Sequence, residues 1–141
     1  MTDTQGTTRR PGISRHSRQL VLAMCGLVVT DLVGGLLAVA AEVNTWAGAW
    51  WTEALLAAPI PMIVVQVVLT LVAVTSARWF SAVAAGLLAL ACLVSVVSGF
   101  FDGGLGNDAL TAALSAYQVF LLVVTAVVSL LAARRAVEVL R

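Results

Sequence analysis

Asp31 is the residue of this sequence with the clearest capacity for chemistry, because it lies at the middle of an apolar run that covers residues 20–41. An ionised carboxylate at the centre of a membrane-spanning helix costs roughly 2.5 to 3.5 kcal/mol on insertion scales. No arginine lies at a comparable depth in the run to pair with it. We therefore expect Asp31 to be protonated or hydrogen-bonded inside a helical bundle, as a proton-exchanging group or as a structural one.

Polar side chains in two other apolar runs are candidates for the same intramembrane site. Gln66 lies near the middle of the run 55–76 and is the natural partner for Asp31. A polar line also follows one face of the last run at helical spacing. Its members are Thr111, Ser115, Gln118, Thr125 and Ser129.

We expect this line to face protein or water. It either packs helices through hydrogen bonds of roughly 0.6 kcal/mol each or borders a hydrated path to Asp31. Tyr117 lies one position off the line, and the sequence does not decide whether it faces the interior or lipid. The predicted intramembrane polar site comprises Asp31, Gln66, Ser115, Gln118 and Thr125.

The sequence contains none of the common catalytic or metal-binding patterns. Its single histidine, His16, lies in the polar N-terminal segment, and there is no Cys/His cluster, glycine-rich phosphate loop or Ser–His–acid set. The segment 101–108, FDGGLGND, lacks the ligand pattern of a calcium loop. We expect a non-enzymatic protein with no metal, no cofactor and no nucleic-acid partner.

The elements that must hold these side chains are membrane-spanning helices. Hydrophobic residues make up 61% of the chain and charged residues 11%, whereas soluble domains have roughly half and a quarter. A helix needs about 20 mainly apolar residues to cross a bilayer. Four runs qualify, over residues 20–41, 55–76, 79–101 and 109–132. The predicted fold class is an all-α integral membrane protein, a four-transmembrane-helix bundle over residues 19–133 with short tails at 1–18 and 134–141.

The positions of the charges predict the orientation of this bundle. All eight basic residues are arginines, found before the first run, between the second and third runs, and after the fourth. In the other two connections the charged residues are all acidic. They are Glu42 and Glu53 in one and Asp102 and Asp108 in the other. By the positive-inside rule both termini are cytoplasmic. The composition suggests a bacterial cytoplasmic membrane, and the polar segment 1–18 is expected to be disordered.

Small residues share the helical face of Asp31. Gly34, Gly35 and Ala38 would let a neighbouring backbone approach closely, so we expect helix packing on this face.

Two helix starts are marked in the sequence. In the second run, Pro59 and Pro61 either mark the start of a helix or kink a helix that begins after residue 52. The last helix is expected to have residue 107, an asparagine, as its N-cap.

Tryptophans flank the predicted spans. Trp46, Trp50 and Trp51 lie in the first outer connection, and Trp79 lies at the inner end of the third run. This placement is typical of anchors at the interface with the lipid bilayer. Trp46 and Trp50 are four residues apart, which favours a short helix, although tryptophans also build cages for quaternary ammonium ligands.

Two features bear on ancestry and function. Residues 52–77 match residues 107–132 at nine of 26 positions, which raises the hypothesis of a duplicated helical hairpin.

In size the chain resembles small multidrug exporters and DoxX-like proteins, and the exporters also keep an acid in the first span, but no further motif is shared. The sequence favours an accessory or structural subunit that packs against a protein partner or a second copy. The alternative is a small proton-coupled transporter or channel that uses Asp31.

Overall fold

The computed structural model describes residues 14–51, 56–101 and 110–141, and these residues form five helices and no strand. The helices are α1 (Arg15–Ala40), α2 (Trp46–Trp51), α3 (Ile60–Thr75), α4 (Arg78–Phe101) and α5 (Ala112–Leu140). Three of them, α1, α4 and α5, are apolar and long enough to cross a membrane. The prediction of an all-helical chain with long apolar helices is therefore confirmed.

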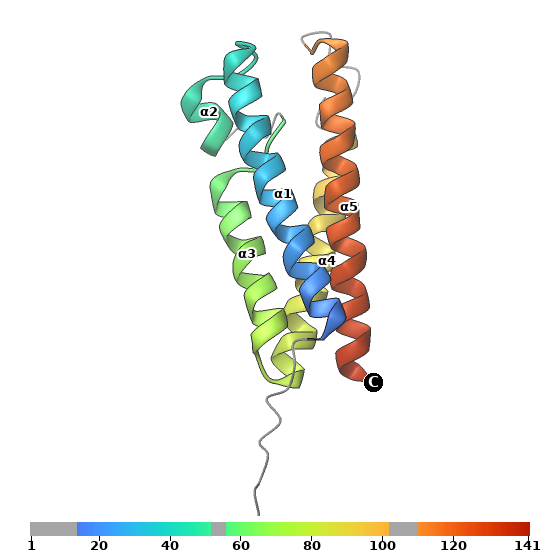
Figure 1. Cartoon of the computed structure of the whole chain (residues 1–141). Helices are drawn as coiled ribbons and strands as arrows, with labels where there is room; N and C mark the ends of the chain where they lie inside the picture. The colour runs from blue at the N-terminus through green and yellow to red at the C-terminus, as the bar shows by residue number, and fades with distance from the viewer. Residues whose placement is uncertain (1–13, 52–55, 102–109) are drawn as a thin grey trace, which may run out of the picture.

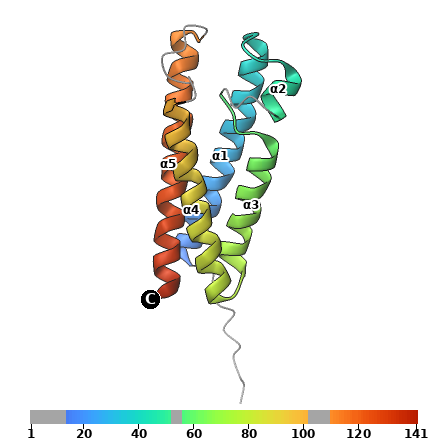
Figure 2. The same cartoon turned by 180° about the vertical axis from the view of Figure 1, so that it is seen from behind.

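The four longer helices lie side by side in an elongated bundle (Figure 1). α1 and α4 run in one direction, and α3 and α5 run in the other (Figures 1 and 2). α4 packs along α5 and α3, while α1 packs against α5 and α3. The short helix α2 lies beside the C-terminal end of α1. Successive long helices are thus antiparallel, and the start of α1 lies at the same end of the bundle as the end of α5.

Both terminal helices extend beyond the predicted spans. α1 begins at Arg15, where the Ser14 hydroxyl caps it by accepting a 3.2 Å hydrogen bond from the Ser17 N–H. Residues 15–18 are therefore helical rather than part of a disordered tail, and residues 1–13 lie outside the described chain. α5 continues to Leu140, through most of the segment predicted to be a tail. Arginine and glutamate favour helices, so nothing in this segment ends α5 at the membrane boundary.

α5 also begins later than the sequence predicts. Its N-cap is Thr111, whose hydroxyl accepts from the Leu114 N–H at 3.4 Å. Thr111 therefore caps the helix instead of belonging to a polar line on its face. The asparagine predicted as the cap, at position 107, lies outside the described residues.

α3 is the shortest of the long helices because prolines delay its start. It has 16 residues with Pro59 as its N-cap, and residues 56–59 before it are not helical. Proline disfavours helical geometry in the residue before it, so the helix starts at the prolines, as the first of the two predicted alternatives has it, and is not a kinked continuation of an earlier helix. At 1.5 Å per residue, α3 is about 24 Å long, shorter than the roughly 30 Å hydrocarbon core of a bilayer.

The core of the bundle is formed by one stripe on each long helix. The buried residues of α1 follow one another at steps of three and four, apart from the adjacent Gly34 and Gly35. The main apolar cluster contains Leu20, Met24, Leu27, Ala73, Ala84, Ala85, Leu88, Cys92, Leu121, Val128 and Ala132. The outer faces are also apolar, with exposed residues such as Leu22, Val64 and Leu90. Helices that are apolar all round are typical of membrane spans.

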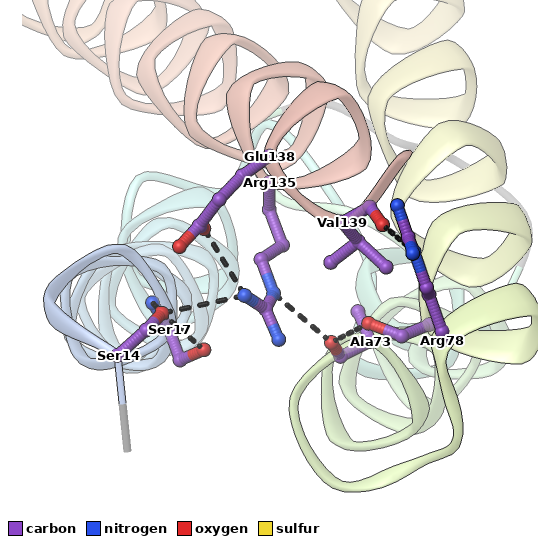
Figure 3. A network of polar contacts seen from close by, with 8 residues as sticks. Ser14, Ser17, Ala73, Arg78, Arg135, Glu138 and Val139 are labelled. Carbon is purple, nitrogen blue, oxygen red and sulfur yellow. Dashed lines mark hydrogen bonds and ion pairs between the residues drawn. The ribbon is translucent and has the colours of Figure 1, made fainter. Parts of the chain in front are cut away.

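Arg135 ties three helices together at the end of the bundle where α1 begins (Figure 3). Its Nε donates to the Ala73 carbonyl near the end of α3 at 3.4 Å, and its guanidinium also donates to the Ser14 hydroxyl at 3.3 Å. An ion pair of 3.0 Å to Glu138 orients the guanidinium. The Ser81 hydroxyl of α4 donates to the same Ala73 carbonyl. The last carbonyls of a helix have no partner within it, so these donors satisfy the end of α3.

Arg78 has a similar role for α5. From the first position of α4, its guanidinium donates to the carbonyl of Val139 (Figure 3). It also donates to the carbonyl of Leu140 at 2.8 Å. These carbonyls belong to the last turn of α5, where a cation is also favoured by the helix dipole. Two of the arginines that the positive-inside rule counts, Arg78 and Arg135, are therefore also capping groups for helix ends.

The predicted internal repeat stays a hypothesis. Thr70 of α3 and Thr125 of α5 are aligned in the repeat, and both are buried with their hydroxyls donating to the carbonyl four residues earlier. α3 nevertheless has 16 residues and α5 has 29. In the aligned positions α5 starts three residues earlier, where α3 is preceded by proline, and it continues ten residues beyond the end of α3.

Candidate functional site

Asp31 lies on the buried stripe of α1 and is 2% exposed. Its Oδ1 accepts a hydrogen bond of 2.9 Å from the Ala58 N–H. Ala58 belongs to connection 56–59, the non-helical residues directly before α3. A non-helical backbone inside an apolar bundle has N–H groups without helical partners, and each needs an acceptor. The carboxyl group of Asp31 supplies one.

The predicted pair of Asp31 and Gln66 is wrong. Gln66 is buried on α3, but no hydrogen bond joins it to Asp31, although both residues belong to the described chain. The reason is register, since Asp31 meets the chain just before α3 begins. Gln66 lies six residues beyond Ile60, about 9 Å further along the helix axis. The signal that could have found Ala58 is Pro59, which keeps the preceding backbone out of a helix.

Gly34 provides the closest backbone contact of this site. A methyl group at Gly34 would overlap the carbonyl group of Leu56, so only glycine fits there. The small-residue face does receive a neighbouring backbone, as expected, but that backbone belongs to connection 56–59 rather than to a helix. Leu56 is fully buried with a φ of 65°, a left-handed conformation that costs a leucine roughly 1–2 kcal/mol. Ala38 lies in the same small cluster as Leu56.

Trp50 occupies the space that Gly35 leaves open. Atoms of its ring lie 2.8 to 3.2 Å from where a side chain on Gly35 would begin. Trp50 is only 9% exposed, so its predicted role as an interface anchor is wrong. Trp46 is 64% exposed and meets the Trp50 ring edge-on, with centroids 5.9 Å apart. The absence of a side chain at Gly35 explains why one indole of α2 turns inward.

The exposed tryptophans differ from Trp50 in their surroundings. Trp51 and Trp79 are 64% and 74% exposed, and Trp79 is the second residue of α4. Both remain available as interface anchors, as does Trp46.

Tyr117 brings α5 to the same region of α1. Its hydroxyl donates to the carbonyl of Thr30, the residue before Asp31, at 2.5 Å. An atom of its ring also lies 3.0 Å from the Cβ position of Gly34. The sequence left the direction of Tyr117 open, because it lies beside the predicted polar line rather than on it. The structure therefore adds Tyr117 and connection 56–59 to the surroundings of Asp31.

The predicted polar line of α5 divides into separate local contacts. Thr125 is buried, but its hydroxyl donates to the Leu121 carbonyl of its own helix at 2.9 Å. Ser129 donates to the Ala89 carbonyl of α4 at 2.8 Å, and Ser115 is half-buried. These contacts pack α5 internally and against α4, and they form no continuous line of side-chain hydrogen bonds toward Asp31.

Two further buried polar atoms have no hydrogen-bond partner among the described residues. They are the side-chain carbonyl oxygen Oε1 of Gln118 and the indole Nε1 of Trp50. Trp50 contacts Gly35 of α1, while Gln118 is the residue after Tyr117 on α5. An unpaired buried polar atom costs roughly 1–3 kcal/mol. The stretch of α1 from Asp31 to Gly35 thus has a buried carboxyl group and, at Trp50, a buried indole N–H without an acceptor among the described residues.

Comparisons with protein-family models, curated proteins and solved structures gave no significant match. Within the part of the chain that the structure describes, no group of three His, Cys, Asp or Glu side chains could hold a metal ion. Fold and site define an all-helical protein with three apolar helices that are compatible with a multi-pass membrane protein. Its function has to be argued from the geometry around Asp31.

Proposed function

We propose that this chain is a non-enzymatic, multi-pass protein of a bacterial cytoplasmic membrane that serves as an accessory or structural subunit. The observation that carries the proposal is the hydrogen bond from the Ala58 N–H to the buried Asp31 carboxyl group. It gives the acid inside the bundle a structural task, which is to hold a non-helical backbone segment against α1. If Asp31 is structural, a partner protein would be bound by the outer surface of the bundle.

The direction of the helices supports a fourth crossing of the membrane. α1 and α4 run in the same direction (Figure 1), so the chain must return between them if both cross the bilayer. Connection 56–59 and α3 are the described part of that return. Non-helical backbone at membrane depth is tolerated where it is buried in protein, and Leu56 and Ala57 are both buried. With arginines at the start of α1, at Arg78 and at the C-terminal end of α5, both termini would then be cytoplasmic.

The outer surface supports a role in packing against lipid and a partner protein. All four long helices carry large exposed apolar residues, among them Val33 on α1, Val68 on α3, Leu87 on α4 and Val123 on α5. Lipid covers such faces, and so does a partner helix or a second copy of the chain. Helix association in membranes depends on close packing rather than on burial from water.

Co-purification tests this proposal. The tagged chain should be extracted at its native expression level in mild detergent and its associated proteins quantified by mass spectrometry, with a tag-only strain as control. We expect one membrane protein, or a second copy of the chain, in a constant ratio across detergents. A chain that is always recovered as a lone monomer would contradict the proposal.

A second function, proton-coupled transport, is favoured by the buried Oε1 of Gln118 that has no partner among the described residues. In several transporters, substrate and ion sites lie where a spanning helix is interrupted near the bilayer midplane. Connection 56–59 against Asp31 has this form. In that function Asp31 would exchange the proton, with Gln66, Gln118, Ser115 and Thr125 along the route.

Proteoliposomes with an imposed pH gradient separate the two functions. A structural subunit leaves the decay of the gradient at the rate of empty vesicles, both as wild type and as Asp31→Asn. A proton-coupled transporter accelerates the decay, and Asp31→Asn abolishes this effect while the protein remains folded. Acceleration that survives Asp31→Asn would remove Asp31 from the mechanism.

A further inference from the structure

An apolar groove runs between α1 and α3 on the outside of the bundle. Its volume is about 350 Å³, and its lining includes Val21, Cys25, Val28, Val67, Thr70 and Leu71. The hydroxyl of Thr70 donates to the Gln66 carbonyl at 2.8 Å, so it is already paired. Cys25 is a free, exposed thiol. The groove therefore offers a hydrocarbon surface with no unpaired polar group of its own lining.

Arg18 lies just beyond one end of this groove. It precedes Val21, Cys25 and Val28 at steps of three, four and three, which places all four residues on one face of α1. Arg18 is exposed and forms no ion pair with any described residue, whereas Arg135 is paired with Glu138. A cation is thus available where the hydrocarbon groove meets the end of the bundle.

The length of the groove identifies its occupant. On α1 the lining of the groove runs from Val21 to Val29, which is eight positions or about 12 Å along the helix, and Arg18 lies three positions before it. One leaflet is half of the roughly 30 Å hydrocarbon core, or about 15 Å. The groove itself stays within one leaflet, whereas a partner transmembrane helix would also cover the exposed apolar residues of α1 beyond it, such as Leu32 and Leu36. An acyl chain with its headgroup at Arg18 has the required length.

We infer that this groove binds one acyl chain of an anionic phospholipid whose phosphate is held by Arg18. A guanidinium matches the geometry of a phosphate and can donate two parallel hydrogen bonds to it. The inference rests on the membrane-spanning arrangement proposed above, but it holds for an accessory subunit and for a transporter alike, since either can carry a lipid at this place.

Native mass spectrometry tests the lipid site. The chain should be purified in detergent with equal amounts of phosphatidylglycerol and phosphatidylcholine that carry identical acyl chains. We expect the monomer to retain one phosphatidylglycerol with a preference of about fivefold, the factor that corresponds to about 1 kcal/mol per arginine near an anionic headgroup. Arg18→Gln should remove the preference, while Arg134→Gln, an exposed arginine on α5, should keep it.

A groove-filling variant tests the acyl-chain half of the site. Cys25→Trp should reduce the retention of both lipids, whereas Leu22→Trp should not, because Leu22 is exposed on the same helix but does not line the groove. Retained preference in Arg18→Gln, or unchanged retention in Cys25→Trp, would overturn the inference. A lipid-free dimer that Cys25→Trp converts to a monomer would assign the groove to a second copy.

Thiol reactivity gives a second measurement that needs no substitution in the groove. Bound lipid should slow the reaction of Cys25 with a maleimide in micelles containing phosphatidylglycerol, compared with phosphatidylcholine. Arg18→Gln should react equally fast in both. Equal rates in the wild-type protein would overturn the inference even if Cys25→Trp fails to fold.

Discussion

At the scale of the residue, Asp31 is satisfied by a backbone N–H rather than by a side chain. A side-chain partner such as Gln66 would have to give up the freedom of several rotatable bonds, which costs up to about 2 kcal/mol. The Ala58 N–H is already held by the chain on both sides, so pairing it with the carboxyl group costs little further freedom. A backbone donor is therefore the less costly partner for an acid inside this bundle.

Two replacements of Asp31 should separate the effect of losing the acidic group from the effect of losing its hydrogen bond on the free energy of unfolding. Asp31→Ala leaves the Ala58 N–H without an acceptor and should lower the free energy of unfolding by about 1–3 kcal/mol. Asp31→Asn keeps an acceptor oxygen of similar shape and should lose less. Unfolding in dodecyl maltoside, followed by far-UV circular dichroism, measures the difference. Equal losses in the two variants would contradict the structural role of the Ala58 contact.

Gly34 and Gly26 provide a matched pair of helical glycines on α1. A methyl group at Gly34 meets the Leu56 carbonyl group, whereas one at Gly26 meets nothing within 4 Å. Gly34→Ala should therefore destabilise the bundle by about 1–3 kcal/mol through overpacking. Gly26→Ala should be neutral or stabilising by up to about 1 kcal/mol, because alanine favours helices. The same unfolding assay compares them, and similar effects would refute the close approach of Leu56.

At the scale of the element, the helices are closed by groups from elsewhere in the chain as well as by local caps. α1 ends in a Schellman arrangement, in which the N–H groups of Glu42 and Val43 donate to the carbonyls of Val39 and Ala38. Glu42 has a φ of 56° at the position where glycine is usual. α3 and α5 instead rely on Arg135 and Arg78.

Removing the Arg135 side-chain contacts should loosen three helices at once. Arg135→Gln loses the donors to the Ala73 carbonyl and the Ser14 hydroxyl, so the free energy of unfolding should fall by about 1–3 kcal/mol. Hydrogen exchange should also rise in the last turn of α3. Arg134→Gln is the control, since Arg134 is exposed and such surface changes usually stay within about 0.5 kcal/mol. Equal stability of the two variants would show that the tie is dispensable.

At the scale of the whole molecule, the bundle is packed more closely on one side than on the other. α4 and α5 meet along small residues, and Gly99 of α4 receives the side chain of Leu122. On the other side, Trp50 and connection 56–59 lie against α1 at Gly34 and Gly35. The described bundle is therefore an α4–α5 pair against which α1 and α3 pack separately, with connection 56–59 and Trp50 filling the space beside α1.

The number of crossings can be measured by the location of the two ends. Reporter domains fused before residue 1 and after residue 141 should both be active only on the cytoplasmic side if α3 crosses the membrane. A reporter inserted between Thr75 and Arg78 should share that location. If α3 does not cross, the three remaining spans would place the ends on opposite sides. Opposite locations would therefore reject the proposed four-crossing topology.

The sequence alone determined the helical class, the buried face of α1 and most helix positions, because apolar runs and helical spacing are local properties of the chain. It also singled out Asp31, since an acid within an apolar run stands out without any structure. The two prolines predicted where α3 begins, but they did not predict which residues of α1 the non-helical connection 56–59 contacts. The tertiary structure decided that Asp31 bonds to Ala58, that Trp50 turns inward onto Gly35 and that Tyr117 reaches Thr30. These contacts depend on the register between helices, which is set by packing of distant segments and leaves no periodic signal in either segment alone.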